Sequence, residues 1–199
     1  LTVKIRVADW RDRDMVQRLR AQIMLFPALD GGLYELLRWP IFLNHVAVKA
    51  DGGIIGFTSA SLFSAAAAES NGLVVDEHHR QQGIASRLRG TQARDLGLMG
   101  VHRLYCSVDI GNVEAVVMVK SHFPEHLGLL AVDGHTHLYQ AADVTDLETQ
   151  INLKHPVGAA TELHKERLKQ KAEGAKAHLA QMQTASEVAQ AKIRLRGEN

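Results

Sequence analysis

Residues 80–85, which read Arg-Gln-Gln-Gly-Ile-Ala, carry the clearest chemical signal in the sequence. An apolar run rich in β-branched residues ends at Val75, and a helical pattern of apolar residues begins at Ile84. The first turn of a helix has unpaired N–H groups, a glycine there lets the backbone approach a ligand closely, and an adjacent arginine attracts anions. This segment is therefore a candidate cradle for a pyrophosphate group. The simpler alternative is a surface turn in which Gly83 only permits the bend.

The elements that would hold this turn follow from the periodicity of the chain. Two β-rich runs flank Asp51-Gly52-Gly53, whose glycines supply the positive φ values of a tight hairpin turn. Asp9 or Asp12 could cap a first helix. In chain order we expect a strand at 3–9, a helix toward Phe26, a short helix at 31–39, a hairpin at 45–63, a strand at 66–75, a helix after Gly83, a strand at 103–110, a helix at 112–120 and a strand at 136–142. This order predicts a mixed α/β (α+β) fold.

The turn is similar to the Arg/Gln-x-x-Gly-x-Gly/Ala signature of the GNAT superfamily, the acyl-CoA-dependent N-acyltransferases. Residues 72–88 resemble the strand–turn–helix core of that family, and residues 51–57 resemble its preceding hairpin. Residues 5–12 are similar to its opening strand and helix, and residues 108–123 to a later strand and helix. The resemblance implies a mostly antiparallel, twisted mixed sheet flanked by helices, with acetyl-CoA as the acyl donor and no metal.

The resemblance also implies an acyl-CoA site in two parts. A strand that splays from its neighbour would leave free backbone groups for the pantetheine arm, and the helix after Gly83 would receive the pyrophosphate. Carried over residue by residue, the implied binding residues are Val74, Val75, Arg80, Gln81, Gln82, Gly83, Ile84, Ala85, Ser86 and Asn112.

Transfer to an amine needs a base for the ammonium and an acid for the leaving thiolate. Glu69 is the candidate base, because it lies on the predicted central strand 11 residues before Arg80, the offset of the catalytic glutamate in the histone-type branch of the family. The alternative is that Glu69 is a strand residue that faces solvent.

The expected acid is missing from this sequence. Counted from Asn112, Val119 occupies the position where many family members carry a tyrosine, and valine cannot donate a proton. The usual Gly-Phe after that helix is replaced by Ser-His-Phe-Pro. Ser121 and His122 are nearby candidates for the acid, and Tyr105 is a more distant one. The departure puts activity in doubt, although water can also serve as the acid.

Composition narrows the remaining classes of protein. The apolar fraction of 46% is ordinary for a globular protein, and no stretch approaches the ~18–20 continuous apolar residues of a membrane span. The single cysteine, Cys106, excludes an intrachain disulfide and is more typical of a core than of a nucleophile. His135 and His137 could share a strand face, but with no cysteine nearby we expect no metal site. The few aromatic residues are not interleaved with basic ones, so nucleic-acid binding is not indicated.

The C-terminal part differs in character from the rest. Residues 1–153 hold 14 basic and 17 acidic residues, whereas residues 154–199 hold nine and five. Pro156 and Gly158 disfavour a continuous helix, so we place a domain over 1–153 and a helical extension over 154–199. The extension carries a narrow, coiled-coil-like apolar seam at Leu168, Ala172, Ala175, Leu179, Met182, Ser186, Ala189 and Ile193. Such a helix is marginal alone, so it needs either its own domain or another chain as a partner.

Two classes of function remain open. The first is an N-acyltransferase, most simply an acetyltransferase, that moves an acyl group from acyl-CoA to an amine in the cytoplasm. The second is a catalytically weak or inactive module of the same fold that serves the assembly of a bacterial complex or viral particle. In either case the sequence predicts a homo-oligomer or larger assembly through the C-terminal helix, and no membrane partner.

Overall fold

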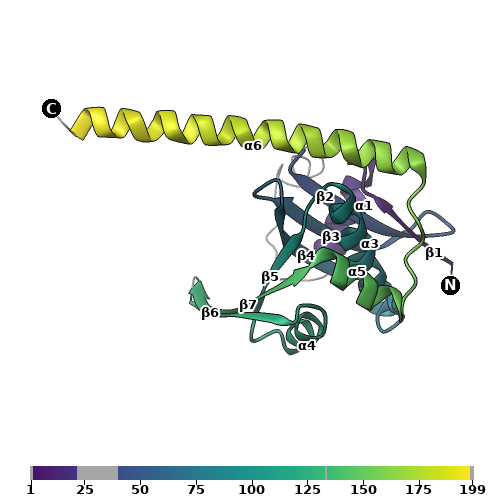
Figure 1. The fold of residues 1–199 in the computed structure, drawn as a ribbon. Coiled ribbons are helices and arrows are strands. Elements are labelled where there is room, and N and C mark those ends of the chain that lie inside the picture. Colours follow the sequence, from purple (N-terminus) through teal and green to yellow (C-terminus); the bar gives the residue numbers. More distant parts are fainter. Residues whose placement is uncertain (1, 22–39, 133, 198–199) are drawn as a thin grey trace.

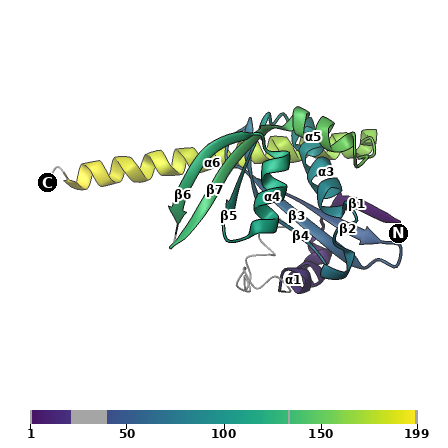
Figure 2. The same ribbon diagram turned by 90° about the horizontal axis from the view of Figure 1, so that it is seen from below.

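A seven-stranded sheet with the order β1-β2-β3-β4-β5-β7-β6 forms the centre of the protein in the computed structural model, which describes residues 2–21, 40–132 and 134–197 (Figures 1 and 2). All neighbouring strands are antiparallel except β4 and β5, which run parallel. The strands are β1 (Val3–Val7), β2 (Phe42–Lys49), β3 (Ile54–Leu62), β4 (Ala67–Val75), β5 (Arg103–Asp109), β6 (Glu125–Val132) and β7 (His135–Asp143). The prediction of a mixed, mostly antiparallel sheet is therefore confirmed.

Helices connect and cover the strands. They are η1 (Trp10–Asp12), α1 (Arg13–Ala21), η2 (Glu77–His79), α3 (Ile84–Leu98), α4 (Val113–His122), α5 (Val144–Asn152) and α6 (Glu162–Gly197). Asp9 caps the first of them, since its side chain accepts a hydrogen bond from the Arg11 N–H group while Asp12 accepts one from the Asp9 N–H group. The predicted helix at 31–39 and the end of the first helix at 22–26 lie outside the described residues.

The two faces of the sheet are covered by different helices. Residues Val74 and Val75 are both buried and point to opposite faces, as neighbours on a strand do. Val74 belongs to the cluster that packs under α1, together with Val16 and Phe57. Val75 belongs to the cluster under α3, together with Leu88. Strand β4 is therefore buried on both sides, and α3 starts directly beyond its end.

Helix α5, which the sequence analysis missed, packs closely and antiparallel against α3. A Cβ atom on Gly90 would lie 2.8 Å from methyl carbons of both Ile151 and Val157, so a side chain there would push the two segments apart. Seven residues further along α3, Gly97 faces Val144 at the other end of α5. Gly83, Gly90 and Gly97 are spaced by seven residues and so share one helix face. This face lets α5 end beside the N-terminus of α3.

The long helix α6 has two unlike halves. Leu168, Ala172 and Ala175 are buried in the same core cluster as the sheet, with Leu179 packed against it. Further along, Met182 is half exposed, and the helix projects beyond the domain as a single rod (Figure 1). The first half of the predicted seam therefore packs on its own chain. Whether the helix also contacts another chain, and whether the domain boundary lies at 153/154, stay predictions.

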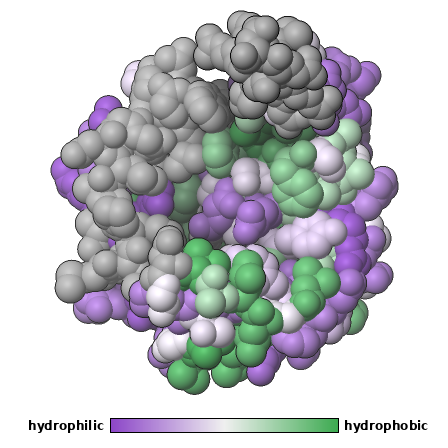
Figure 3. All heavy atoms as spheres, turned by 90° about the vertical axis from the view of Figure 1, so that its left-hand side faces the viewer, coloured by the Kyte–Doolittle hydropathy of each residue, from purple (hydrophilic) through white to green (hydrophobic). Residues whose placement is uncertain are grey.

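Strand β6, also missed from the sequence, is exposed on both faces. Leu127, Leu129, Leu130 and Val132 are all exposed on this edge strand. Figure 3 views the end of the molecule toward which α6 and the β6–β7 hairpin project, and hydrophobic residues gather in its lower part. A contiguous exposed apolar patch is a candidate interaction surface. Among the helices of the described ranges, none is long and apolar enough to cross a membrane.

Candidate active site

The parallel strands β4 and β5 separate halfway along their length. Their pairing begins at Ala67 opposite Arg103 and ends at Ser70 opposite Cys106. Beyond that point β5 continues beside β7 as far as Asp109, whereas β4 continues beside β3 as far as Val75. A gap therefore opens between the two central strands from Ser70 onward. The splay that the resemblance implied is present.

A β-bulge lies at the point where the gap begins. Along the β3–β4 ladder Ser59 pairs with Gly72 and Ala60 pairs with Ser70, so Asn71 is the extra residue. Bulges bend a strand and increase its twist, and they are common next to active sites. The bulge gives a local reason for β4 to leave β5 after Ser70.

The turn at 80–83 stands where β4 ends and α3 begins. Gln81 has φ of 60° and Gly83 has φ of 73°, both in the left-handed region. No side chain caps the N-terminus of α3 at Gly83, so the N–H groups of its first turn, which starts with Ile84, Ala85 and Ser86, are left for another acceptor. The exposed Arg80 donates from Nε to the Val75 carbonyl oxygen (3.2 Å), which holds its side chain beside the strand end, and the neighbouring Gln82 is exposed. A surface turn with this geometry can hold an anion.

Asn112 precedes α4 as Gly83 precedes α3. Its side-chain oxygen accepts a hydrogen bond from the Ala115 N–H group (3.1 Å), so Asn112 caps this helix. Helices α3 and α4, which follow the two parallel strands, therefore start at the same end of the gap.

The closed end of the gap, where β4 and β5 stop pairing at Ser70 and Cys106, is its apex. At the apex the two faces of the sheet carry different side chains. Glu69 and Tyr105 lie opposite each other in the parallel register and so share one face of the sheet. Ser70 and Cys106 form the next pair and point to the other face, where α3 lies. Glu69 is half-buried, so it is neither a freely solvated residue nor a core residue.

A fully buried arginine lies on the α3 side of the apex. Arg89 is 1% exposed, and its Nη1 atom donates to the Ser70 hydroxyl and to Oε1 of Gln92 (2.9 Å). The guanidinium carbon lies 5.3 Å from the centre of the Phe123 ring. Arg89 was not among the predicted site residues, although Arg89, Gln92, Ala93 and Leu96 follow the i, i+3, i+4, i+7 spacing of a buried helix face.

The two candidate acids at the end of α4 differ in their surroundings. Ser121 is exposed and donates from Oγ to the Met118 carbonyl oxygen (2.7 Å). His122 is half-buried, and its Nδ1 atom has no hydrogen-bond partner within the described part of the chain. Burial, together with the positive charges of Arg89, His155 and Lys154, lowers the pKa of His122 to about 4. Its imidazole is therefore neutral near pH 7. Val119 is buried in the core and contributes no polar group.

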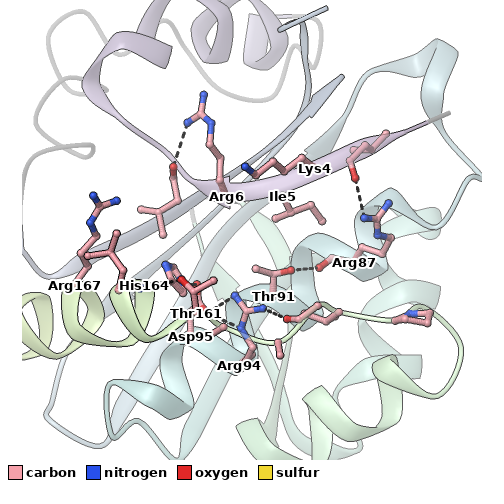
Figure 4. Close-up of a pocket in the computed structure, with 18 residues that line it drawn as sticks. Lys4, Ile5, Arg6, Arg87, Thr91, Arg94, Asp95, Thr161, His164 and Arg167 are labelled. Carbon is pink, nitrogen blue, oxygen red and sulfur yellow. Dashed lines mark hydrogen bonds and ion pairs between the residues drawn. The ribbon is translucent and has the colours of Figure 1, made fainter. Parts of the chain in front are cut away.

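A separate polar cavity of about 530 Å³ lies between β1, α3 and the start of α6, and it includes no residue of the turn at 80–83 (Figure 4). At its floor the fully buried Asp95 carboxylate is 2.8 Å from Nε2 of His45 and 2.8 Å from Nε2 of His164, and Arg94 binds its other oxygen. Burial acts to raise the pKa of Asp95, but the hydrogen bonds and charges of His45 and Arg94 outweigh it and lower the pKa to about 2. Because His164 belongs to α6, this cluster ties the C-terminal helix to the domain.

Comparison with known proteins defines the class to which this fold and site belong. Residues 9–123 match the model of the acetyltransferase (GNAT) family, whereas no curated protein sequence matches the chain. The splayed parallel strands and the left-handed turn before α3 are thus those of an acyl-CoA-dependent acetyltransferase. The chain belongs to the GNAT family.

Solved structures share the fold at low sequence identity. A putative acetyltransferase from Salmonella typhimurium, solved with acetyl-CoA, has a TM-score of 0.61 and 15% identity over 72% of this chain and 95% of that one. A spermidine N-acetyltransferase from Vibrio cholerae has a TM-score of 0.62 and 15% identity over 73% and 95%. A phosphinothricin acetyltransferase from Sinorhizobium meliloti, in complex with acetyl-CoA, has a TM-score of 0.61 and 16% identity over 72% and 89%. Acetyl-CoA is therefore the cosubstrate whose binding in the gap should be tested.

Proposed function

We propose that this protein transfers the acetyl group of acetyl-CoA to an amine acceptor. The observation that carries the proposal is the gap between β4 and β5, which leads directly to the left-handed turn at Gln81 and Gly83. The unpaired edge of β4 from Asn71 to Val75 supports a site for the pantetheine arm, since its backbone groups are free of β5. The first turn of α3 supports a site for the pyrophosphate.

The dimensions of the gap agree with this ligand. Five residue steps separate Ser70 from Val75, and an extended strand rises about 3.3 Å per residue, so the gap runs for about 17 Å from the turn to the apex. An extended pantetheine arm held at its phosphate end by the turn would thus bring its thioester close to Ser70 and Asn71. The apex is the place where the acetyl group would meet the acceptor.

We assign Glu69 the role of the base. A carboxylate on the face shared with Tyr105 can accept the proton of the attacking amine, either directly or through one water molecule. The amine nitrogen forms a bond to the carbonyl carbon, the carbon–sulfur bond breaks, and its electron pair leaves on the sulfur of CoA. With His122 neutral near pH 7, the thiolate needs stabilisation from another group or protonation by water.

Calorimetric titration with acetyl-CoA and with acetylpantetheine tests this proposal. Acetylpantetheine lacks the pyrophosphate and the adenosine, so it keeps the contacts along β4 and loses those at the turn. We expect saturable binding of acetyl-CoA, a rise in melting temperature with its concentration, and much weaker binding of acetylpantetheine. Release of free CoA with a panel of amines then identifies the acceptor. If acetyl-CoA neither binds nor raises the melting temperature, the proposal is wrong.

A role in assembly is the second candidate function. The exposed leucines of β6 support it, because they lie at the end of the molecule toward which α6 projects, and Met182 of α6 is also exposed (Figures 1 and 3). Light scattering would measure the mass of the full chain and of a variant that ends at residue 180. Fewer chains per particle for the shortened variant would favour assembly through α6. A single chain per particle for both proteins would exclude self-assembly.

A further inference from the structure

The guanidinium of Arg89 has no carboxylate partner among the hydrogen bonds and ion pairs of the described residues. Its described partners are the Ser70 hydroxyl, the Gln92 amide and the Phe123 ring, and its Nε atom is buried without a hydrogen-bond partner there. A buried charge without a counter-charge is destabilising, and buried groups with shifted pKa values are concentrated at functional sites. Burial accordingly lowers the pKa of Arg89. Arg89 is thus a positive charge that the folded protein holds without neutralising it.

This charge lies where the proposed reaction produces a negative one. Ser70 is the last residue of β4 that pairs with β5, so it marks the apex of the gap where the thioester would lie. Ser70 is 6% exposed, and its hydroxyl accepts a hydrogen bond from Arg89. A hydroxyl that accepts from a cation becomes a stronger donor through its own hydrogen atom. That hydrogen is the one donor that the Ser70 side chain has to offer a ligand.

Arg89 also lies close to the position that lacks the expected tyrosine. Its guanidinium packs on Phe123, which is one helical turn after Val119 in sequence, and Val119 and Phe123 belong to the same core cluster. Helix α3 therefore supplies a charged group close to the position that Val119 leaves apolar.

We infer that Ser70 and Arg89 together stabilise the thiolate that leaves in the acetyl transfer. The inference rests on the proposed function. When the carbon–sulfur bond breaks, its electron pair passes to sulfur, and the Ser70 O–H group donates a hydrogen bond to that sulfur. Ser70 acts as a catalytic residue, because it would touch the reacting atom. Arg89 acts as a positioning residue, because it holds and polarises Ser70. The thiolate later takes its proton from water, and the amine proton goes to Glu69.

Other titratable groups surround this pair and enter any test that varies the pH. Cys106 of β5 faces Arg89, and Glu69 of β4 lies near Cys106. From the other direction, His122 approaches from α4, and Lys154 and His155 approach from the segment after α5. Burial raises the pKa of the Cys106 thiol, so that group stays protonated near neutrality. Two ligands that differ only at the sulfur are compared, so that contributions of these groups that do not depend on the sulfur cancel.

The test compares the affinities of CoA and desulfo-CoA, which has hydrogen in place of the thiol, from pH 7 to pH 9.5 by calorimetry. Donors at the sulfur lower the pKa of the bound thiol below that of the free CoA thiol. We expect CoA to bind more tightly than desulfo-CoA by a margin that grows with pH to about tenfold, since a shift of one pKa unit is a tenfold change in affinity for the thiolate. This measurement needs no acceptor and no turnover.

Substitutions test whether Arg89 and Ser70 cause the difference in affinity between CoA and desulfo-CoA. Arg89→Met removes the buried charge but keeps an unbranched side chain, and we expect it to fold and to bind both ligands equally at every pH. Ser70→Ala is a milder change with the same expected loss of the margin. Arg87→Met is the matched control, because Arg87 lies on the same helix but binds the Val3 carbonyl oxygen and lines the other cavity. Its margin should equal that of the wild type.

Three results overturn the inference in different ways. If CoA and desulfo-CoA bind the wild-type protein equally at every pH, the proposed function stands and the role of Ser70 and Arg89 is wrong. If neither ligand binds, both the proposed function and the inference are wrong. A margin that survives unchanged in Arg89→Met and in Ser70→Ala also contradicts the inference.

Discussion

The imidazole ring of His155 lies directly against Gly83, so that a Cβ atom on Gly83 would stand 2.6 Å from Nδ1 of His155. The glycine of the signature is therefore required for two reasons that do not involve a ligand: its φ of 73° and the ring beside it. The binding role proposed for the turn rests on the N–H groups of the first turn of α3. A substitution at Gly83 alone would confuse the two effects.

A double-mutant cycle separates the two requirements. Gly83→Ala should lower the free energy of unfolding by about 1–2 kcal/mol through the left-handed backbone, and further through the contact with His155. In a His155→Ala background the contact is gone, so only the backbone part should remain. We expect a coupling energy of about 0.5 kcal/mol or more from urea unfolding of the four proteins. Strictly additive effects would mean that the ring does not restrict Gly83.

The buried carboxylate of Asp95 should make stability depend on pH in the acid range. Its pKa in the folded protein, about 2, is below the ~3.9 of an unfolded aspartate. The group therefore contributes stability that is fully present above pH 4 and is lost as the pH falls toward 2, by about 2 kcal/mol. Urea unfolding between pH 2 and pH 7 measures this loss.

Asp95→Asn is the matching variant for this effect. It should lower the stability at pH 7 and remove most of the loss between pH 4 and pH 2, because the amide does not titrate. Asp14→Asn, on the exposed side of α1, serves as the control and should keep the wild-type profile. An Asp95→Asn profile that still falls steeply below pH 4 would assign the acid sensitivity to other carboxylates.

The first half of α6 should contribute to the stability of the domain. Leu168 is 2% exposed in the core, whereas Leu163, on the same helix, is 64% exposed. We expect Leu168→Ala to lower the free energy of unfolding by about 2–5 kcal/mol and Leu163→Ala to change it by less than about 0.5 kcal/mol. Equal and small effects would mean that α6 is a passive appendage in solution.

Glu69→Gln keeps the size of the side chain and removes the proton acceptor. With an amine acceptor identified by CoA release, the maximal rate near neutral pH should fall by roughly 10²-fold or more, while the affinity for acetyl-CoA is kept. Glu77→Gln is the control, since Glu77 is exposed in the turn beyond the strand. An unaltered pH–rate profile in Glu69→Gln would assign Glu69 to structure alone.

The sequence predicted the central part of the fold because its signals are local. The β-rich runs of the hairpin at 45–63, the glycine turn at 51–53 and the signature at 80–85 each lie within one short segment, and the splay followed from the family resemblance. Strand β6 was missed because it is exposed on both faces, so it has no period of two in its apolar residues. The helix α5 was missed because its short apolar face is recognised only with its partner, the glycine face of α3.

The candidate site was predictable where the backbone defines it and not where distant segments meet. The turn and the gap depend on one strand and one helix, so the signature was enough to place them. Arg89 meets Ser70, and His155 meets Gly83, only through tertiary packing between α3, β4 and the segment after α5. The sequence held one unused signal, the position of Arg89 on the buried face of its helix.

Hydrogen exchange with and without acetyl-CoA tests the central claim most directly, because the account names the backbone N–H groups that the ligand covers. We expect acetyl-CoA to slow exchange at 71–75 along the open edge of β4 and at 83–86 in the first turn of α3, and to leave β1 and the projecting half of α6 unchanged. Binding that slows exchange only around the cavity lined by Lys4, His164 and Arg167, with no protection at 71–75 or 83–86, would contradict the account.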